Sequence, residues 1–145
     1  MNHDQPAAPR RILALDPGEA RIGVALSDDL GMLAHPRSAI PARDQRHAIR
    51  TIAELVQRER ITEIIVGLPL TLTGAHGAQA RAAQAFAAQL RQAVSVPVRT
   101  ADERLTSAQA ARQAPSAARR RDGTLDSLAA ALLLQAELDA RRRTP

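Results

Sequence analysis

Three acidic residues of this chain occupy positions from which a folded protein can bring them together. Asp16 ends the first apolar run of the chain and is followed at once by a Pro-Gly turn and a second apolar run. Gly18 in this turn is expected to supply backbone angles that other residues resist. Glu103 follows a short strand-like segment, and Asp126 lies in the first turn of a predicted final helix. Since ligand sites in α/β sheets lie beyond the carboxyl ends of the strands, the three acids are expected at one rim.

The chemistry open to such a cluster is metal-dependent phosphodiester cleavage. Carboxylates packed together repel one another unless a cation lies between them, and Mg²⁺ or Mn²⁺ suits oxygen ligands. Two such ions roughly 3.5–4 Å apart can activate a water and stabilise the leaving oxygen. The alternative is that each acid is ordinary: a turn former, a surface partner of Arg104 and a helix-end residue. Three acids at one rim favour the metal site, with Asp16, Glu103 and Asp126 as its catalytic ligands.

The basic residues indicate a polyanionic partner. All 20 are arginine, and the formal net charge is +5. Arginine forks match phosphate oxygens, and their binding releases counterions from nucleic acid. The alternative is a solvated, arginine-rich surface. Because Phe86 is the only aromatic residue, base-stacking platforms are nearly excluded, and a bound nucleic acid would be held by its backbone.

Further candidates for substrate binding flank the acids. The preferred clamp on the substrate is the arginine run 119–121, beside Asp126. Arg21 and Arg104 either pair with phosphate or neutralise the acidic cluster. The segment 67–77 is most simply a surface loop, and its alternative role is to offer Thr71 and His76 to a phosphate. The full set of predicted substrate-binding residues is Arg21, Thr71, His76, Arg104, Arg119, Arg120 and Arg121.

The elements that must position these residues follow the order β-β-β-α-β-α-β-α-α. Strands are predicted over 11–16, 21–27, 32–40, 64–66 and 96–100, and Pro36 confines the third to a sheet edge or a bulge. Three strands followed by βα units indicate an α/β fold, a five-stranded mixed sheet with helices on both faces.

The helices are predicted from caps and from a 3.6-residue apolar period. Asp44 caps the first helix, and the second turns Ala82, Phe86 and Leu90 inward. A capping box at Thr106 opens the third. The last is capped by Thr124, and its apolar stripe is Leu125, Leu128, Ala129, Leu132, Leu133 and Ala136.

The chain is expected to form one domain over residues 11–140, with a disordered tail at 1–10 and a basic tail at 141–145. It contains no cysteine, which fits a reducing cytoplasm. The N-terminus lacks the apolar region of a signal peptide, and no apolar stretch approaches the ~20 residues of a membrane span.

Four sequence blocks resemble the YqgF family of RNase H-like proteins. They are LDPGEARIGVALSD at 15–28, IVGLPL at 65–70, DERLTS at 102–107 and DSLAA at 126–130. The resemblance covers about residues 11–140 and implies an RNase H-like fold. It also implies a Mg²⁺- or Mn²⁺-dependent nuclease of ribosome biogenesis that matures the 5′ end of pre-16S rRNA. It gives metal-binding catalytic roles to the three acids, Asp16, Glu103 and Asp126.

Two positions depart from the family pattern. Ala20 stands where the family often has lysine, and Thr71 where it often has asparagine.

Two other functions stay open. A Holliday junction resolvase acting on DNA would use the same acids but would require a homodimer that presents two sites to symmetric strands. A non-catalytic nucleic-acid-binding assembly or transcription factor has no use for a repulsive acidic cluster. The resemblance favours RNA over DNA, although no residue separates them.

Overall fold

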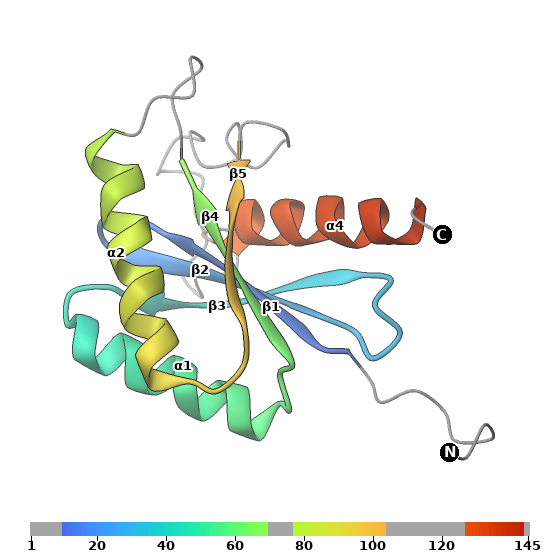
Figure 1. Cartoon of the computed structure of the whole chain (residues 1–145), viewed down its shortest axis with the longest axis horizontal. Helices are drawn as coiled ribbons and strands as arrows, with labels where there is room; N and C mark the ends of the chain where they lie inside the picture. Colours follow the sequence, from blue (N-terminus) through green and yellow to red (C-terminus); the bar gives the residue numbers. More distant parts are fainter. Residues whose placement is uncertain (1–9, 70–76, 104–126, 144–145) are drawn as a thin grey trace.

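A five-stranded mixed sheet forms the centre of the molecule (Figure 1). The computed structural model describes residues 10–69, 77–103 and 127–143. The strands are β1 (Ile12–Pro17), β2 (Arg21–Ser27), β3 (Ala34–Pro41), β4 (Glu63–Leu68) and β5 (Val98–Asp102). They lie in the order β3-β2-β1-β4-β5, with β1–β2 and β2–β3 antiparallel and β1–β4 and β4–β5 parallel. The predicted mixed sheet is confirmed, and Pro36 lies in an edge strand as expected.

Helices cover both faces of the sheet, because the strand residues alternate between two apolar cores. Leu13 and Leu15 of β1 belong to a core shared with α1 (Gln45–Arg58) and α2 (Ala78–Ala93). Ile12 and Ala14 face the opposite way, into a core shared with α4 (Leu128–Arg143). Figure 1 shows α1 and α2 on one side of the sheet and α4 on the other.

The first two described helices differ from the sequence prediction only in detail. Asp44 caps α1 as expected, and its side chain accepts a hydrogen bond from the backbone N–H of His47 at 3.2 Å. Phe86 and Leu90 of α2 are buried, but Ala82 is exposed and the prediction for it was wrong. The buried stripe is Ala80, Ala83, Phe86, Ala87 and Leu90, which leaves residue 82 at its border.

The last strand and the last helix also differ from their predicted bounds. β5 runs from Val98 to Asp102, because its parallel pairing with β4 begins at Ile64 and Val98 and ends at Leu68 and Asp102. The helix predicted after Thr106 and the cap at Thr124 lie outside the described residues.

In α4, Ala130, Leu134 and Leu138 are buried, whereas Leu128 and Leu132 are only partly buried, so the predicted stripe was partly wrong. The helix continues to Arg143, and residues 141–143 are therefore helical rather than a tail. Within the described ranges, no helix has the length and apolar character that a membrane span requires.

A network of ion pairs joins the carboxyl-terminal half of α4 to the β4–β5 edge. Arg99 donates from Nε to Glu63 at 3.0 Å and from Nη2 to Glu137 at 2.6 Å. Arg141 donates from Nη2 to Glu63 at 2.6 Å and from Nε to Glu137 at 3.1 Å. Burial alone would raise the pKa of Glu63 and of Glu137, but hydrogen bonds from the two arginines outweigh it and lower both pKa values.

This network predicts a stability loss in acid. A carboxyl group whose pKa is lowered by folding stabilises the protein above its unfolded pKa of about 4.3, and this contribution is lost as pH falls through the folded value. We expect the Glu63→Gln/Glu137→Gln double variant to melt lower than the wild type at pH 7. Because the pairs are only partly buried and solvent screens them, the loss should be about 0.2–1 kcal/mol per pair. The difference should shrink toward pH 3.

The control is Glu54→Gln, at an exposed position of α1. Melting curves recorded by circular dichroism at pH 7, 5, 4 and 3 provide the measurement. A double variant whose melting temperature differs from that of the wild type by the same amount at every pH would contradict the assignment.

Candidate active site

Asp16 lies at the carboxyl end of β1 with its side chain on the face that α4 covers. It follows Ala14 of the α4 core by two residues, and strand residues two apart share a face. Its side chain is buried, with the residue 6% exposed. Opposite it on β2 stands Gly23. The sequence prediction that Asp16 ends a strand at the sheet rim is thus matched by its position.

The turn after Asp16 requires a glycine for steric reasons. The N–H of Gly18 donates to the carbonyl oxygen of Arg21 at 2.9 Å. A Cβ atom at residue 18 would lie 2.8 Å from that oxygen, a distance that side chains do not tolerate. Among the described glycines only Gly31 has a positive φ. The expected unusual backbone angles at Gly18 were therefore wrong, and the close approach of the carbonyl is the reason for the glycine.

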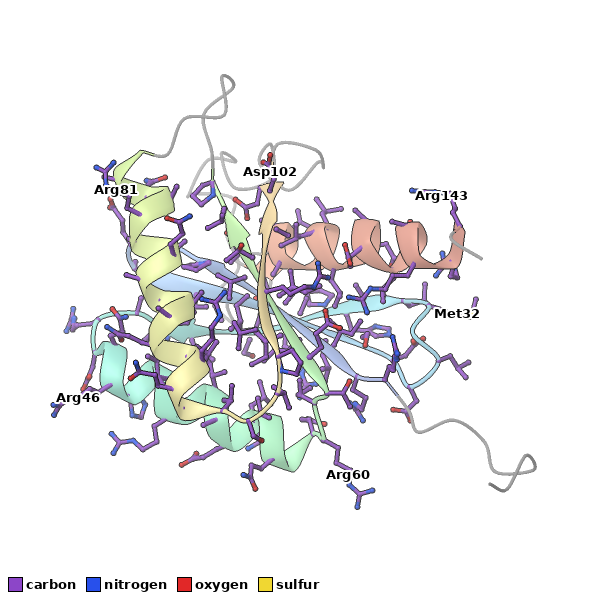
Figure 2. The ribbon with its side chains drawn as sticks, in the orientation of Figure 1. Met32, Arg46, Arg60, Arg81, Asp102 and Arg143 are labelled. Carbon is purple, nitrogen blue, oxygen red and sulfur yellow. The ribbon has the colours of Figure 1, made fainter. Side chains whose placement is uncertain are left out.

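Glu103 reaches the same face from the end of β5. It is fully buried, and its side chain contacts Gly67 of β4. The β1–β4 register pairs Leu15 with Val66, so the next residues, Asp16 and Gly67, stand at the same level. The structure therefore brings Asp16 and Glu103 to one face at one rim. Asp102, next to Glu103, marks the end of β5 at this rim in Figure 2.

Asp126 lies outside the described residues, and the described part of the chain resumes at Ser127 directly after it. Ser127 is fully buried at the start of α4. Its hydroxyl accepts a hydrogen bond from the N–H of Val24 at 2.9 Å and donates to the carbonyl of Arg37 at 2.5 Å. The hydroxyl thus bridges β2 and β3 at the point where their register shifts. Val24 follows Gly23, the residue opposite Asp16, so the chain next to Asp126 is attached beside Asp16.

The predicted substrate-binding residues are placed only in part. Arg21 is exposed at the start of β2, directly beyond the Gly18 turn. Thr71, His76, Arg104 and the arginine run 119–121 lie outside the described residues. A cavity of about 190 Å³ also opens beside the turn, lined by Pro17, Ile22, Phe86 and their neighbours. It lies on the α1–α2 face, so it is separate from the acids.

The donor atoms of this site fit a hard divalent cation. Asp16 and Glu103 supply only oxygen, and Mg²⁺ typically binds one or two carboxylates together with substrate phosphates. Buried carboxylates are paired or coordinate metals in folded proteins. No group of three metal-ligating side chains occurs in the described part of the chain, and the third predicted ligand, Asp126, is outside it. The two acids nevertheless meet the minimum that Mg²⁺ uses.

Comparison with known proteins identifies the family. The model of the RuvX family, described as Holliday junction resolvase, matches residues 10–140. The chain belongs to the RuvX family. This agrees with the resemblance to YqgF proteins found in the sequence.

Curated relatives of this RuvX-family chain carry one shared name, "Putative pre-16S rRNA nuclease". The protein from Chloroflexus aurantiacus is 44% identical over 137 residues, covering 92% of this chain and 90% of the relative. The Roseiflexus protein is 41% identical, covering 92% and 97%. The Rhodococcus jostii protein is 44% identical over 149 residues, covering 97% and 83%.

A solved structure with the same fold is RuvC of Thermus thermophilus in complex with a Holliday junction substrate. It has a TM-score of 0.55 and 17% identity, and the match covers 93% of this chain and 97% of RuvC. At this identity the match supports the fold alone. The RNase H-like fold expected from the sequence is confirmed.

Two contributors to the site were missed by the sequence analysis. Gly67 and Ser127 were part of the quoted blocks but received no role. β4 extends to Leu68, so Gly67 lies in the strand and not in the loop predicted over 67–77. The available signal was a glycine next to the predicted buried strand 64–66, where close approach of another group is common. For Ser127 the signal was a small hydroxyl residue next to a candidate ligand at a helix start.

The hydroxyl bridge predicts a measurable contribution to stability. Ser127→Ala removes the acceptor of the buried Val24 N–H, and leaving such a donor unsatisfied costs about 1–3 kcal/mol. Ser27→Ala is a matched control, because the buried Ser27 hydroxyl accepts from the N–H of Ile12 at 2.8 Å in the same sheet. Urea unfolding should show comparable losses for both variants. A neutral Ser127→Ala beside a destabilised Ser27→Ala would show that the bridge is not formed.

Proposed function

We propose that this RuvX-family chain is a metal-dependent nuclease that processes the 5′ end of pre-16S rRNA. The observation that carries the proposal is the burial of Asp16 and Glu103 on one face at the carboxyl rim of the sheet. A purely binding protein gains nothing from two buried acids there. The name shared by the curated relatives supports pre-16S rRNA as the substrate, and processing of this RNA would take place in the cytoplasm.

Asp16, Glu103 and Asp126 would hold Mg²⁺ or Mn²⁺ in this site. When bound, the metal supplies activation of a water and stabilisation of the leaving oxygen in phosphodiester hydrolysis. The chain itself keeps the ligands in place. Asp16 lies on the central strand β1, and Glu103 directly follows β5, which pairs in parallel with β4. Ser127 attaches the start of α4 to β2 beside these two acids. Such preorganisation on rigid elements is what catalysis by positioning requires.

Arginine side chains would hold the nucleic acid by its phosphates. Arg21 is exposed directly beyond the turn that follows Asp16, a position suited to a phosphate next to the cleaved bond. The arginine run 119–121, Arg104, Thr71 and His76 remain predicted contacts to the substrate. Because the chain has a single phenylalanine and no other aromatic residue, contacts to the backbone should dominate binding.

A second candidate function is resolution of Holliday junctions in DNA. The description of the matching family model favours it. The same acids would act, but symmetric cleavage would require a homodimer with two sites. The two functions therefore differ in the substrate and in whether a homodimer is required. Both would use the same metal ligands in each chain.

The proposal is tested by cleavage assays on matched substrates. We expect the wild type with Mg²⁺ or Mn²⁺ to cut a pre-16S rRNA fragment, and EDTA or Asp16→Asn to abolish the cleavage, because the site then lacks its cation or a ligand. Glu54→Gln is the control, because it changes an exposed carboxylate of α1, the helix that packs on the sheet face opposite the acids. A single-stranded DNA and a four-way junction are tested in parallel.

Cleavage that persists in excess EDTA would refute the metal-dependent site. Cleavage of the junction but not of the RNA would instead assign the second function.

A further inference from the structure

Gly67 is in steric contact with the side chain of Glu103. A Cβ atom built at residue 67 would lie 2.6 Å from Oε1 of Glu103, 3.0 Å from Cδ and 3.1 Å from Cγ. The backbone of Gly67 is outside the left-handed region, so alanine could adopt it. Among the described residues, the three atoms nearest to such a Cβ all belong to Glu103.

The strand register explains what this contact achieves. Glu103 directly follows β5, Asp16 belongs to β1, and β4 runs between these two strands. Neighbouring strands are about 4.8 Å apart, so β5 and β1 are separated by about 9.6 Å. Two oxygens that share one Mg²⁺ lie within about 4 Å of each other, because each Mg²⁺–oxygen bond is about 2.0–2.1 Å. A carboxylate that remained above β5 would be too far from Asp16.

Glu103 does not remain above β5. Gly67 pairs with Ala101 of β5 and stands level with Asp16 of β1. The carboxylate of Glu103 lies against Gly67, so it has crossed onto the intervening strand, one strand spacing from Asp16. Any side chain at residue 67 would occupy that space. The absence of a side chain at Gly67 thus leaves the space through which the Glu103 side chain extends toward Asp16.

We propose that Gly67 is a positioning residue of the active site. Its missing side chain lets Glu103 cross β4 and bind the same metal centre as Asp16. This role rests on the proposed function, because it assumes that Glu103 is a metal ligand. Glycine weakens a strand interior relative to residues with a side chain, and the placement of Glu103 gives a reason for it here.

The test is a double-mutant cycle of Gly67→Ala and Glu103→Ala, with Mg²⁺ and Mn²⁺ binding measured by calorimetry and metal-free melting by circular dichroism. Gly67→Ala should weaken metal binding about tenfold to a hundredfold, the range found for groups that orient metal ligands. It should also lower the metal-free melting temperature. In the Glu103→Ala background the same substitution should leave metal binding unchanged and should not lower the melting temperature, because the clashing atoms are gone.

Gly77→Ala is the matched control, since a Cβ at Gly77 meets no atom of the described residues within 4 Å. It should bind metal like the wild type. If Gly67→Ala does not fold but the double variant does, the steric coupling to Glu103 is supported; if neither folds, the role is overturned.

The outcomes separate the two proposals. Weak metal binding by Glu103→Ala together with wild-type binding by Gly67→Ala would overturn the positioning role alone. Wild-type metal binding by Glu103→Ala would refute Glu103 as a ligand, and the positioning role would fall with the proposed function.

Discussion

Mutual repulsion between buried carboxylates is the constraint on which this structure depends. Asp16 and Glu103 are brought to one face of the sheet at one rim, where water can screen their charges only weakly. Such an arrangement forms only if the surrounding fold holds both acids against their repulsion or a cation offsets it. The sheet holds both acids in place, because each lies at or just beyond the end of one of its strands.

The neighbours of the acids are small, and the covering helix is attached at both ends. Asp16 has Gly23 opposite it on β2 and Gly67 level with it on β4, so the sheet itself leaves space for carboxylates. At its start, α4 is held by the buried Ser127 hydroxyl between β2 and β3. Toward its other end, Arg141 and Glu137 join it to Glu63 and Arg99 of the β4–β5 edge. The helix that begins next to Asp126 is therefore fixed to the same sheet that carries the other two acids.

Much of this arrangement could be predicted from local patterns. Asp16 was identified because an apolar run ending in an acid and a Pro-Gly turn is a strand-and-turn signal that needs no distant information. The apolar stripe of α4 was partly wrong because residues 132–134 are consecutive leucines, and such a run does not define one face. The bounds of β5 were shifted because they depend on its pairing with β4, more than 30 residues away.

The contacts that complete the site depend on three-dimensional register. The contact between Gly67 and the side chain of Glu103 is defined only once β4 and β5 are paired, because it joins a residue of β4 to the residue that directly follows β5. The bridge made by Ser127 requires the shift of register between β2 and β3, which no local pattern indicates. The reason for Gly18 was also missed, because the carbonyl that approaches it belongs to the other strand of the hairpin.

We propose that Asp16, Glu103 and Asp126 share one cation site, and metal-linked stability tests this proposal most directly. The melting temperatures of the wild type, Asp126→Asn and a control are compared in EDTA and in Mg²⁺. The control is Asp122→Asn, at an acid four residues earlier in the sequence that is not among the predicted ligands. Removal of one repelling charge should make Asp126→Asn more stable than the wild type in EDTA. Mg²⁺ at a hundred times its dissociation constant should stabilise the wild type and Asp122→Asn by about 2.7 kcal/mol, and Asp126→Asn much less. An Asp126→Asn variant that melts lower in EDTA and gains the full stabilisation from Mg²⁺ would contradict the shared site.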